Sequence, residues 1–307
     1  MARKNSKNSV VNFGKLLTDA FKELFENDPL RMAGATAFFT TFALPPILII
    51  IIQVLGLVFD AKKISLQLFK RLGSIIGNES QLQIVSTLTA FQKLAQNWFI
   101  TIGGFIFLIF IATTLFTIIK GSLNQVWRIK AVHKRNLWDR LRGRVQSIFI
   151  IFVTGFLFVI ALLVEGAQAF VGKHIYDFPK GIVFYFTSGL NYLISVTIVT
   201  VWFALVFRYL PDGRPGWRVA FTGGFVTSLL FNSGKIALLW LLTNSNITTV
   251  YGASGSIVLL LLFVFYCSLI LYYGAAFTNI WATYHESPIR PLPYATHYKL
   301  ADAKEKE

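Results

Sequence analysis

Two ionisable side chains interrupt long apolar runs of this 307-residue chain. Glu165 ends the charge-free run that follows Arg144, and Lys235 lies 17 residues beyond Arg218. If these runs cross a membrane, a charged group within them is costly and is therefore a candidate for function. Counted from the basic residues before them, the two side chains lie at similar depths. We therefore expect them to form an ion pair or, alternatively, each to extend separately to the outer interface.

Uncharged polar residues also fall within apolar runs. Gln53 and Asn191 join Glu165 and Lys235 as a candidate intramembrane polar site, because such groups can line a polar cavity. The alternative is that they form hydrogen bonds between helices, as Asn232 and Ser233 could also do. The sequence leaves both interpretations open.

The sequence gives no sign of a catalytic, cofactor-binding or metal-binding site. The four histidines are far apart and lack the spacing of metal ligands, and the single cysteine excludes a cysteine-cluster metal site. No glycine-rich phosphate loop ending in Gly-Lys is present. We expect no catalysis, no cofactor and no metal, although an active site assembled from distant residues within the membrane stays open.

The apolar runs are long enough for helices that span a bilayer. Hydrophobic residues make up 55% of the chain and charged residues 14%, whereas soluble domains carry about 25% charged residues. A spanning helix needs about 20 apolar residues. The sequence predicts an all-α, polytopic membrane protein with six transmembrane helices, at about 33–58, 98–119, 145–168, 182–207, 219–243 and 252–283. The proline pair Pro45-Pro46 is expected to kink or break the first of these.

The distribution of lysine and arginine predicts the orientation. The segments 1–31, 120–144 and 208–218 and the C-terminal tail carry 21 of these residues, against 7 in the segments on the other side. Basic residues favour the cytoplasmic side of a membrane. We predict a cytoplasmic segment 1–31, a membrane domain 32–285 and a cytoplasmic tail 286–307, in the bacterial inner (plasma) membrane, with both ends in the cytoplasm. The polar N-terminal segment does not resemble a cleavable signal peptide.

Three segments outside the spans have distinctive patterns. Residues 10–25 have the spacing of an amphipathic helix that ends before Pro29. It could lie in the inner interface or pack on the ends of the bundle. The outer segment 61–97 predicts two further amphipathic helices. The basic stretch 128–144, with Trp127 and Trp138, suits anionic lipid or RNA, or is an ordinary cytoplasmic loop with interfacial tryptophans.

Several motifs, taken in order, resemble the YihY/BrkB family of bacterial inner-membrane proteins, once labelled ribonuclease BN. They are Asp28-Pro29 with Ala33-Gly34 and the Pro45-Pro46 pair; Leu123-Asn124-Gln125-Val126-Trp127-Arg128; Leu210-Pro211-Asp212-Gly213 with Trp217-Arg218; Tyr251-Gly252-Ala253-Ser254-Gly255-Ser256; and Tyr272-Tyr273-Gly274-Ala275-Ala276. Family members often have a glutamate where Ala276 stands here. The resemblance implies six spans and an inner-membrane location, but it supplies no settled activity.

These observations favour a permease or a protein that handles lipids or other amphipaths in the cell envelope. The expected partners are membrane lipids, with anionic headgroups at the cytoplasmic face, and no nucleic acid; a homo-oligomer stays open. The alternative is a membrane scaffold that transports nothing. The old ribonuclease label is the weakest option, because no cluster of histidine and aspartate is present to hold a metal for phosphodiester hydrolysis.

Overall fold

The structure is a computed structural model that describes residues 6–56, 98–132, 180–244 and 255–298, together with seven single residues between them. This part of the chain is mostly helical. The helices are α1 (Ser6–Phe25), α2 (Pro29–Gly56), α5 (Trp98–Val126), α7 (Lys180–Tyr209), α8 (Trp217–Asn244) and α10 (Gly255–Tyr284). The short strands are β1 (Ile129–Ala131), β2 (Gly213–Arg214), β3 (Arg290–Pro291) and β4 (Ala295–His297).

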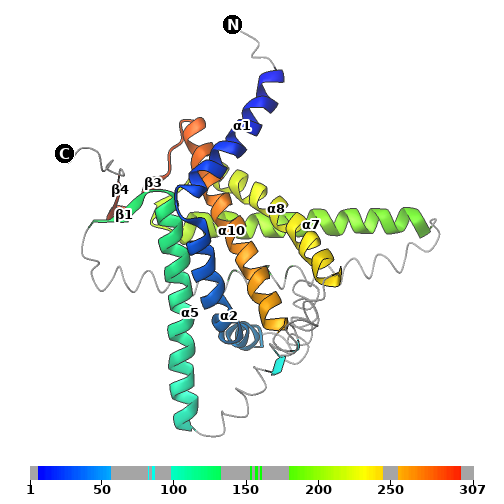
Figure 1. Cartoon of the computed structure of the whole chain (residues 1–307), viewed down its shortest axis with the longest axis vertical. Helices are drawn as coiled ribbons and strands as arrows, with labels where there is room; N and C mark the ends of the chain where they lie inside the picture. The colour runs from blue at the N-terminus through cyan, green and yellow to red at the C-terminus, as the bar shows by residue number, and fades with distance from the viewer. Residues whose placement is uncertain are drawn as a thin grey trace.

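The long helices pack as a row in the order α5, α2, α10, α8 and α7, and α1 lies against α10 (Figure 1). In the figure, α5, α2 and α10 run side by side, whereas α7 extends away from them. Sequence neighbours are therefore not always neighbours in space, since α10 lies between α2 and α8.

Two antiparallel pairs of strands join segments that are distant in sequence. β1 pairs with β4, and β2 pairs with β3. The strand after α5 and the turn after α7 are thus both tied to the chain that follows α10. Sequence analysis predicted none of these strands, because two or three residues are too few to show a period-two pattern.

Helices α1, α5 and α10 all stop at the end of the helix bundle that carries the strands, each followed by a residue in the left-handed conformation. The φ angles are 54° at Asp28 and 52° at both Arg128 and Glu286. After α10, the amide of Ser287 donates to the carbonyl of Ala282, a hydrogen bond that closes a helix C-terminus. Pro29 then begins α2, a position where its missing N–H costs nothing.

The largest cluster of buried apolar residues lies where these helix ends meet. It joins Leu16, Ala20 and Leu24 of α1 to Trp127 and Phe207, which lie at the ends of α5 and α7, and to a long stretch of α10. The buried residues of α1 recur at helical spacing, as the amphipathic pattern predicted. The structure shows that this face of α1 packs on the bundle; a position in the inner interface stays a prediction.

Close packing of α8 depends on a glycine. A side chain added at Gly224 would place its Cβ 2.6 Å from the carbonyl oxygen of Thr200 and 2.9 Å from the amide nitrogen of Ala204, both in the backbone of α7. Because these are backbone atoms, they cannot rotate away. Gly224 therefore allows the two helices to approach as closely as they do.

The described helices overlap five of the six predicted spans. Two segments, Gly189–Tyr209 and Val258–Tyr284, are long and apolar enough to cross a membrane by length and composition. The predicted span 145–168, apart from four of its residues, and most of the outer segment 61–97 lie outside the described residues. That all six helices cross a membrane stays a prediction.

The expected break in the first span is not observed. Helix α2 continues through Pro45 and Pro46 to Gly56. Just before the prolines, Ala43 packs against Ile111 and Leu115 of α5, and the Thr41 hydroxyl donates to the Ala37 carbonyl. Packing against a neighbouring helix and threonine hydroxyl groups help such helices tolerate proline and stay continuous. In Figure 1 the second half of α2, in lighter blue, runs in a different direction from the first half. Of the predicted kink or break, the structure therefore shows a change of direction and no break.

Candidate functional site

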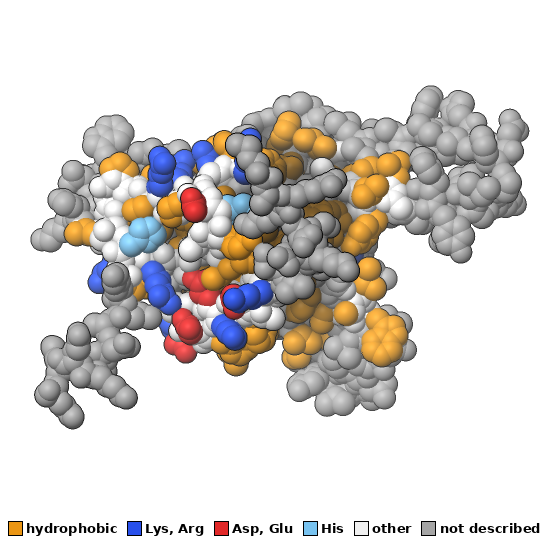
Figure 2. All heavy atoms as spheres, turned by 90° about the horizontal axis from the view of Figure 1, so that it is seen from above, with side chains coloured by type: hydrophobic (Ala, Val, Ile, Leu, Met, Phe, Trp, Pro, Cys, Tyr) orange, Lys and Arg blue, Asp and Glu red, His pale blue; other side chains and the backbone are white. Residues whose placement is uncertain are grey.

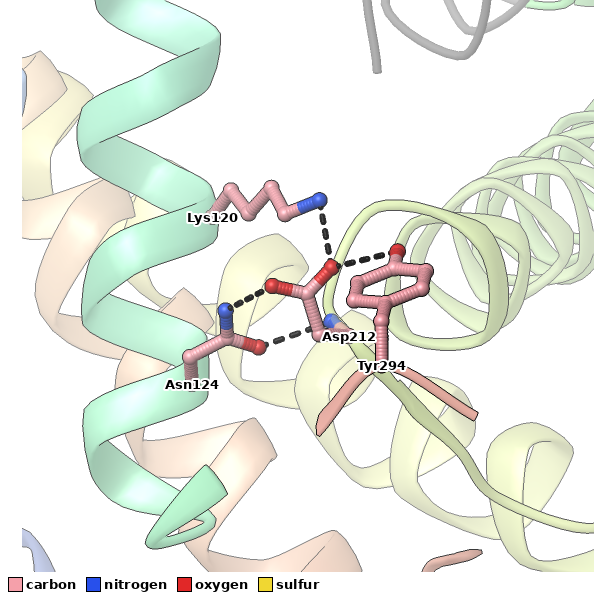
Figure 3. Close-up of polar contacts among 4 residues, drawn as sticks. All are labelled: Lys120, Asn124, Asp212 and Tyr294. Atoms are coloured by element: carbon pink, nitrogen blue, oxygen red, sulfur yellow. Dashed lines mark hydrogen bonds and ion pairs between the residues drawn. The ribbon is translucent and has the colours of Figure 1, made fainter. Parts of the chain in front are cut away.

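The carboxylate of Asp212 is the centre of a polar cluster in which α5, the turn after α7 and the segment between β3 and β4 meet (Figure 3). Lys120 Nζ lies 2.6 Å from Asp212 Oδ1, and the Tyr294 hydroxyl donates to the same oxygen at 2.8 Å. The Asn124 side-chain amide donates to Asp212 Oδ2 at 2.8 Å. The Asp212 side chain is 0% exposed, so these contacts replace the water that a carboxylate requires.

The backbone of Asp212 belongs to the same network. Its amide donates to Asn124 Oδ1 at 2.8 Å, and its carbonyl accepts from the amide of Leu292 at 2.8 Å. Asn124 thus forms two hydrogen bonds with one residue, and these fix both its orientation and that of the turn. We call Lys120, Asn124, Asp212 and Tyr294 the Asp212 cluster.

Local sequence explains how each residue reaches the cluster. Lys120 and Asn124 are four residues apart on α5, a spacing that places both on one face of a helix. Asp212 lies between Pro211 and Gly213 in the turn that ends α7. A Cβ at Gly213 would lie 2.5 Å from the Ile129 side chain and 2.8 Å from that of Ile289. A side chain at Gly213 would therefore require the side chains of Ile129, Ile289 and Trp127 to move, and glycine avoids this.

The electrostatics of the cluster are those of a buried ion pair with complete hydrogen bonding. The Lys120 side chain is 13% exposed and its partner is fully buried. Removing one member of such a pair costs about 3–5 kcal/mol, because the other charge is left without compensation. The carboxylate is closed off from solvent and is held by an ammonium group, an amide and a hydroxyl, so the cluster is suited to holding three segments together rather than to proton transfer.

Trp127 adds a second link across the same end. Its side chain is 1% exposed, and Nε1 donates to the carbonyl of Ala275 in α10 at 2.9 Å. The interpretation of Trp127 as an interfacial tryptophan was therefore wrong. The ring is large enough to fill the space between α5 and α10, and its N–H satisfies a carbonyl inside the core.

A further polar contact attaches α1. Asn279 Nδ2 donates to Glu23 Oε1 at 2.7 Å, while Glu23 Oε2 is buried without a hydrogen-bond partner. Burial raises the pKa of the Glu23 carboxyl, partly offset by the hydrogen bond from Asn279 and the charge of Arg128. The adjacent Glu26 carboxylate pairs with Arg128 at 3.0 Å.

The predicted intramembrane site is only partly described. Asn191 is an exposed residue of α7, and Lys235 is a partly buried residue of α8 that has an interaction within the protein. Gln53 lies in α2, but its side chain, like all of Glu165, is outside the described residues. Convergence of these four residues, and the Glu165–Lys235 pair, stay predictions.

The motif positions that carry the family resemblance are better represented. Asn124, Trp127, Pro211 and Asp212 gather at the Asp212 cluster or beside it, and Trp127 bonds to the residue after Gly274. Trp217 and Arg218 begin α8, Pro45 is inside α2 and Gly255 begins α10. Tyr251 and Gly252 lie outside the described residues.

Sequence reasoning missed several members of this site. Lys120 was counted only as a topological charge, although its four-residue separation from Asn124 was a usable signal. Tyr294 has no such signal, since it reaches Asp212 only through the strand pairings of the tail. In the part of the chain with described coordinates, no group of three or more His, Cys, Asp or Glu side chains could hold a metal ion.

Comparisons with known proteins identify the family of this chain. The family described as "Virulence factor BrkB" matches residues 20–295. The chain is 26% identical over 274 residues to a "UPF0761 membrane protein" of Verminephrobacter eiseniae, covering 86% of this chain and 61% of the relative. It is 23% identical over 274 residues to one of Saccharophagus degradans, covering 88% and 60%.

A shorter relative, from Psychromonas ingrahamii, is 26% identical over 260 residues, covering 82% of this chain and 83% of the relative. The chain thus spans about three fifths of the length of the first two relatives. No solved structure matches. The match covers the helices and strands that build the Asp212 cluster, and the chain therefore belongs to the BrkB family, whose curated relatives are named membrane proteins.

Proposed function

We propose that this chain is a six-span inner-membrane protein that moves or handles an anionic amphipath, such as a lipid or a lipid precursor, and that both of its ends lie in the cytoplasm. The proposal includes no catalytic step, cofactor or metal. It rests on the family assignment, on the placement of charged segments and, above all, on polar groups buried between helices.

The placement of charge supports the orientation. Hydrogen bonds and an ion pair join all four segments that are predicted to be cytoplasmic. These contacts lie at the end of the helix bundle that carries the strands. Gln125 donates to the carbonyl of Asn27, joining 120–144 to 1–31, and the Asp212 cluster joins 208–218 to 120–144 and to the tail. Figure 2 looks onto this end, where basic and acidic side chains gather among hydrophobic ones.

The observation that carries the transport proposal is the polar contact between α7 and α8. Ser195 Oγ lies 2.9 Å from Asn232 Oδ1, and Thr200 Oγ1 lies 2.8 Å from Ser228 Oγ. These two interhelical hydrogen bonds are one helical turn or more apart along each helix, within otherwise apolar segments. α7 packs chiefly on α8, so exchange of these bonds would let α7 shift relative to the row.

The direct test is reconstitution into vesicles that contain a fluorescent anionic phospholipid, with accessibility to a membrane-impermeant quencher as the readout. We expect wild-type protein to make the inner-leaflet lipid accessible, and Asn232→Leu to slow this about fivefold, since it removes one interhelical bond worth about 1 kcal/mol. Thr222→Val, which removes an exposed hydroxyl of α8, is the matched control. If wild-type protein moves neither lipid nor any other anionic amphipath, the transport proposal fails.

A non-transporting scaffold is the second candidate, favoured by the closed Asp212 cluster. A fully bonded carboxylate and two strand pairs give this end a fixed shape that could recruit a partner. In that case, substitutions at Asn124 and Trp127 would abolish function in cells, whereas Lys235→Met would leave it intact.

A further inference from the structure

A group of arginines and exposed aromatic rings lies at the turn between α7 and α8. Trp217, Phe221 and Phe225 recur every four residues along α8 and have exposed fractions of 42%, 42% and 48%. The rings of Trp217 and Phe221 stack, with centroids 5.7 Å apart and an interplanar angle of 27°. Together the three rings form a continuous apolar stripe on one face of the helix.

Three arginines lie at the start of this stripe, and two of them are on aromatic rings. The guanidinium of Arg208 lies 4.4 Å from the centroid of the Trp217 ring, and that of Arg214 lies 5.3 Å from the centroid of Tyr209. Arg218 is exposed on the first turn of α8. The aromatic faces hold Arg208 and Arg214 in place without neutralising their charge.

A fourth arginine lies opposite one of these. In the β2–β3 pair, Arg214 and Arg290 are direct partners, so their side chains lie on the same face of the ladder. Like charges placed directly opposite one another are destabilising unless something compensates them. Among the residues the structure describes, none of these four arginines forms an ion pair with a carboxylate; Arg208 instead donates to the carbonyl of Pro215.

We propose that this patch, the α7–α8 patch, binds one anionic glycerophospholipid. The phosphate is held by Arg214, Arg218 and Arg290, and an acyl chain lies along the aromatic stripe. Phe225 is eight residues from Trp217, or about 12 Å along the helix, which carries the stripe from the level of the headgroup into the hydrocarbon. Clusters of four or more basic residues next to a spanning helix suit anionic headgroups.

The proposal rests on the proposed placement of this end at the inner interface, because only there do the arginines face headgroups while the rings face acyl chains. A free anion would match the arginines alone. The stripe requires a ligand with a phosphate and a chain, and this favours a lipid.

The test uses the full-length protein purified in a neutral detergent. Native mass spectrometry measures retention and titration of phosphatidylglycerol, and phosphatidylcholine and the chain-free headgroup glycerophosphoglycerol are the comparison ligands. The variant Arg214→Gln/Arg218→Gln removes two charges of the patch. Lys15→Gln/Lys22→Gln removes two exposed charges of α1 at the same end and is the matched control.

We expect wild-type protein to prefer phosphatidylglycerol over both comparison ligands. Each basic residue contributes about fivefold to anionic-lipid affinity, so the patch variant should bind about 25-fold more weakly while the control stays near wild type. Brominated acyl chains should quench wild-type fluorescence more than that of Trp217→Phe.

Equal weakening by the control, equal affinity for phosphatidylcholine, or full binding by the headgroup alone would each overturn the lipid site. Absence of lipid movement in vesicles, with this binding intact, would overturn the transport proposal and leave the site standing.

Discussion

The ion pair between Lys120 and Asp212 gives the sharpest prediction. Asp212→Asn removes the negative charge and turns one acceptor oxygen into an NH2 group that must face a donor. Lys120→Met leaves the carboxylate without its cation in a site that is 0% exposed. We expect each single variant to lose about 3 kcal/mol, the lower end of the range for breaking a buried pair, since Lys120 keeps some contact with solvent.

The double variant separates the ion pair from the rest of the cluster. Lys120→Met/Asp212→Asn leaves no unpaired charge. Its loss of stability should therefore be smaller than the sum of the two single losses by about 1–3 kcal/mol. Lys130→Met, at an exposed lysine of β1, is the control and should change stability by less than about 0.5 kcal/mol.

The assay is thermal unfolding of the purified protein in detergent. For a chain of 307 residues, a loss of about 3 kcal/mol corresponds to a fall in midpoint of about 5 °C. Single variants that melt within 1–2 °C of wild type, or a double variant whose loss is the full sum, would refute the assignment of Asp212 as the residue that holds this end together.

Three further changes test other contacts. Glu23→Gln should raise the midpoint at pH 7–8 by about 2 °C, because burying the charged carboxylate costs about 1 kcal/mol. The pKa of Glu23 is raised above 4.5 in the folded protein, so the contribution of the protonated Glu23 to stability is present below pH 4.5 and is lost as the pH rises. The advantage of the variant should therefore disappear in acid. Gly224→Ala should destabilise the contact between α7 and α8 by about 2 kcal/mol through clash with backbone atoms, whereas Gly34→Ala, where no atom lies within 4 Å, should be neutral or stabilising in the same melting assay. Trp127→Phe should lower the midpoint by about 4 °C, because the buried Ala275 carbonyl loses its donor; an unchanged midpoint would contradict this.

The helices could be predicted from the sequence, whereas the way their ends are joined could not. Long charge-free runs mark α2, α5, α7, α8 and α10 because lipid-facing and core-facing residues are both apolar. The apolar stripe of α1 likewise follows from helical spacing.

The contacts of Asp212 depend on tertiary structure and left little local signal. Tyr294 is 82 residues from Asp212, and it arrives there through two strand pairs of two or three residues. The choice between a kink and a break at Pro45-Pro46 also depends on tertiary structure, because α2 stays continuous where α5 supports it.

Cysteine accessibility tests the central claim, that the three segments joined by the Asp212 cluster and the segment 1–31 bonded to them form one cytoplasmic face. In a Cys267→Ser background, one exposed residue of each segment is changed singly: Lys22→Cys, Lys130→Cys, Gly216→Cys or Ser287→Cys. We predict that all four are protected from a membrane-impermeant maleimide in intact cells and are labelled in inverted vesicles. Labelling of any one of them from outside intact cells would contradict the account.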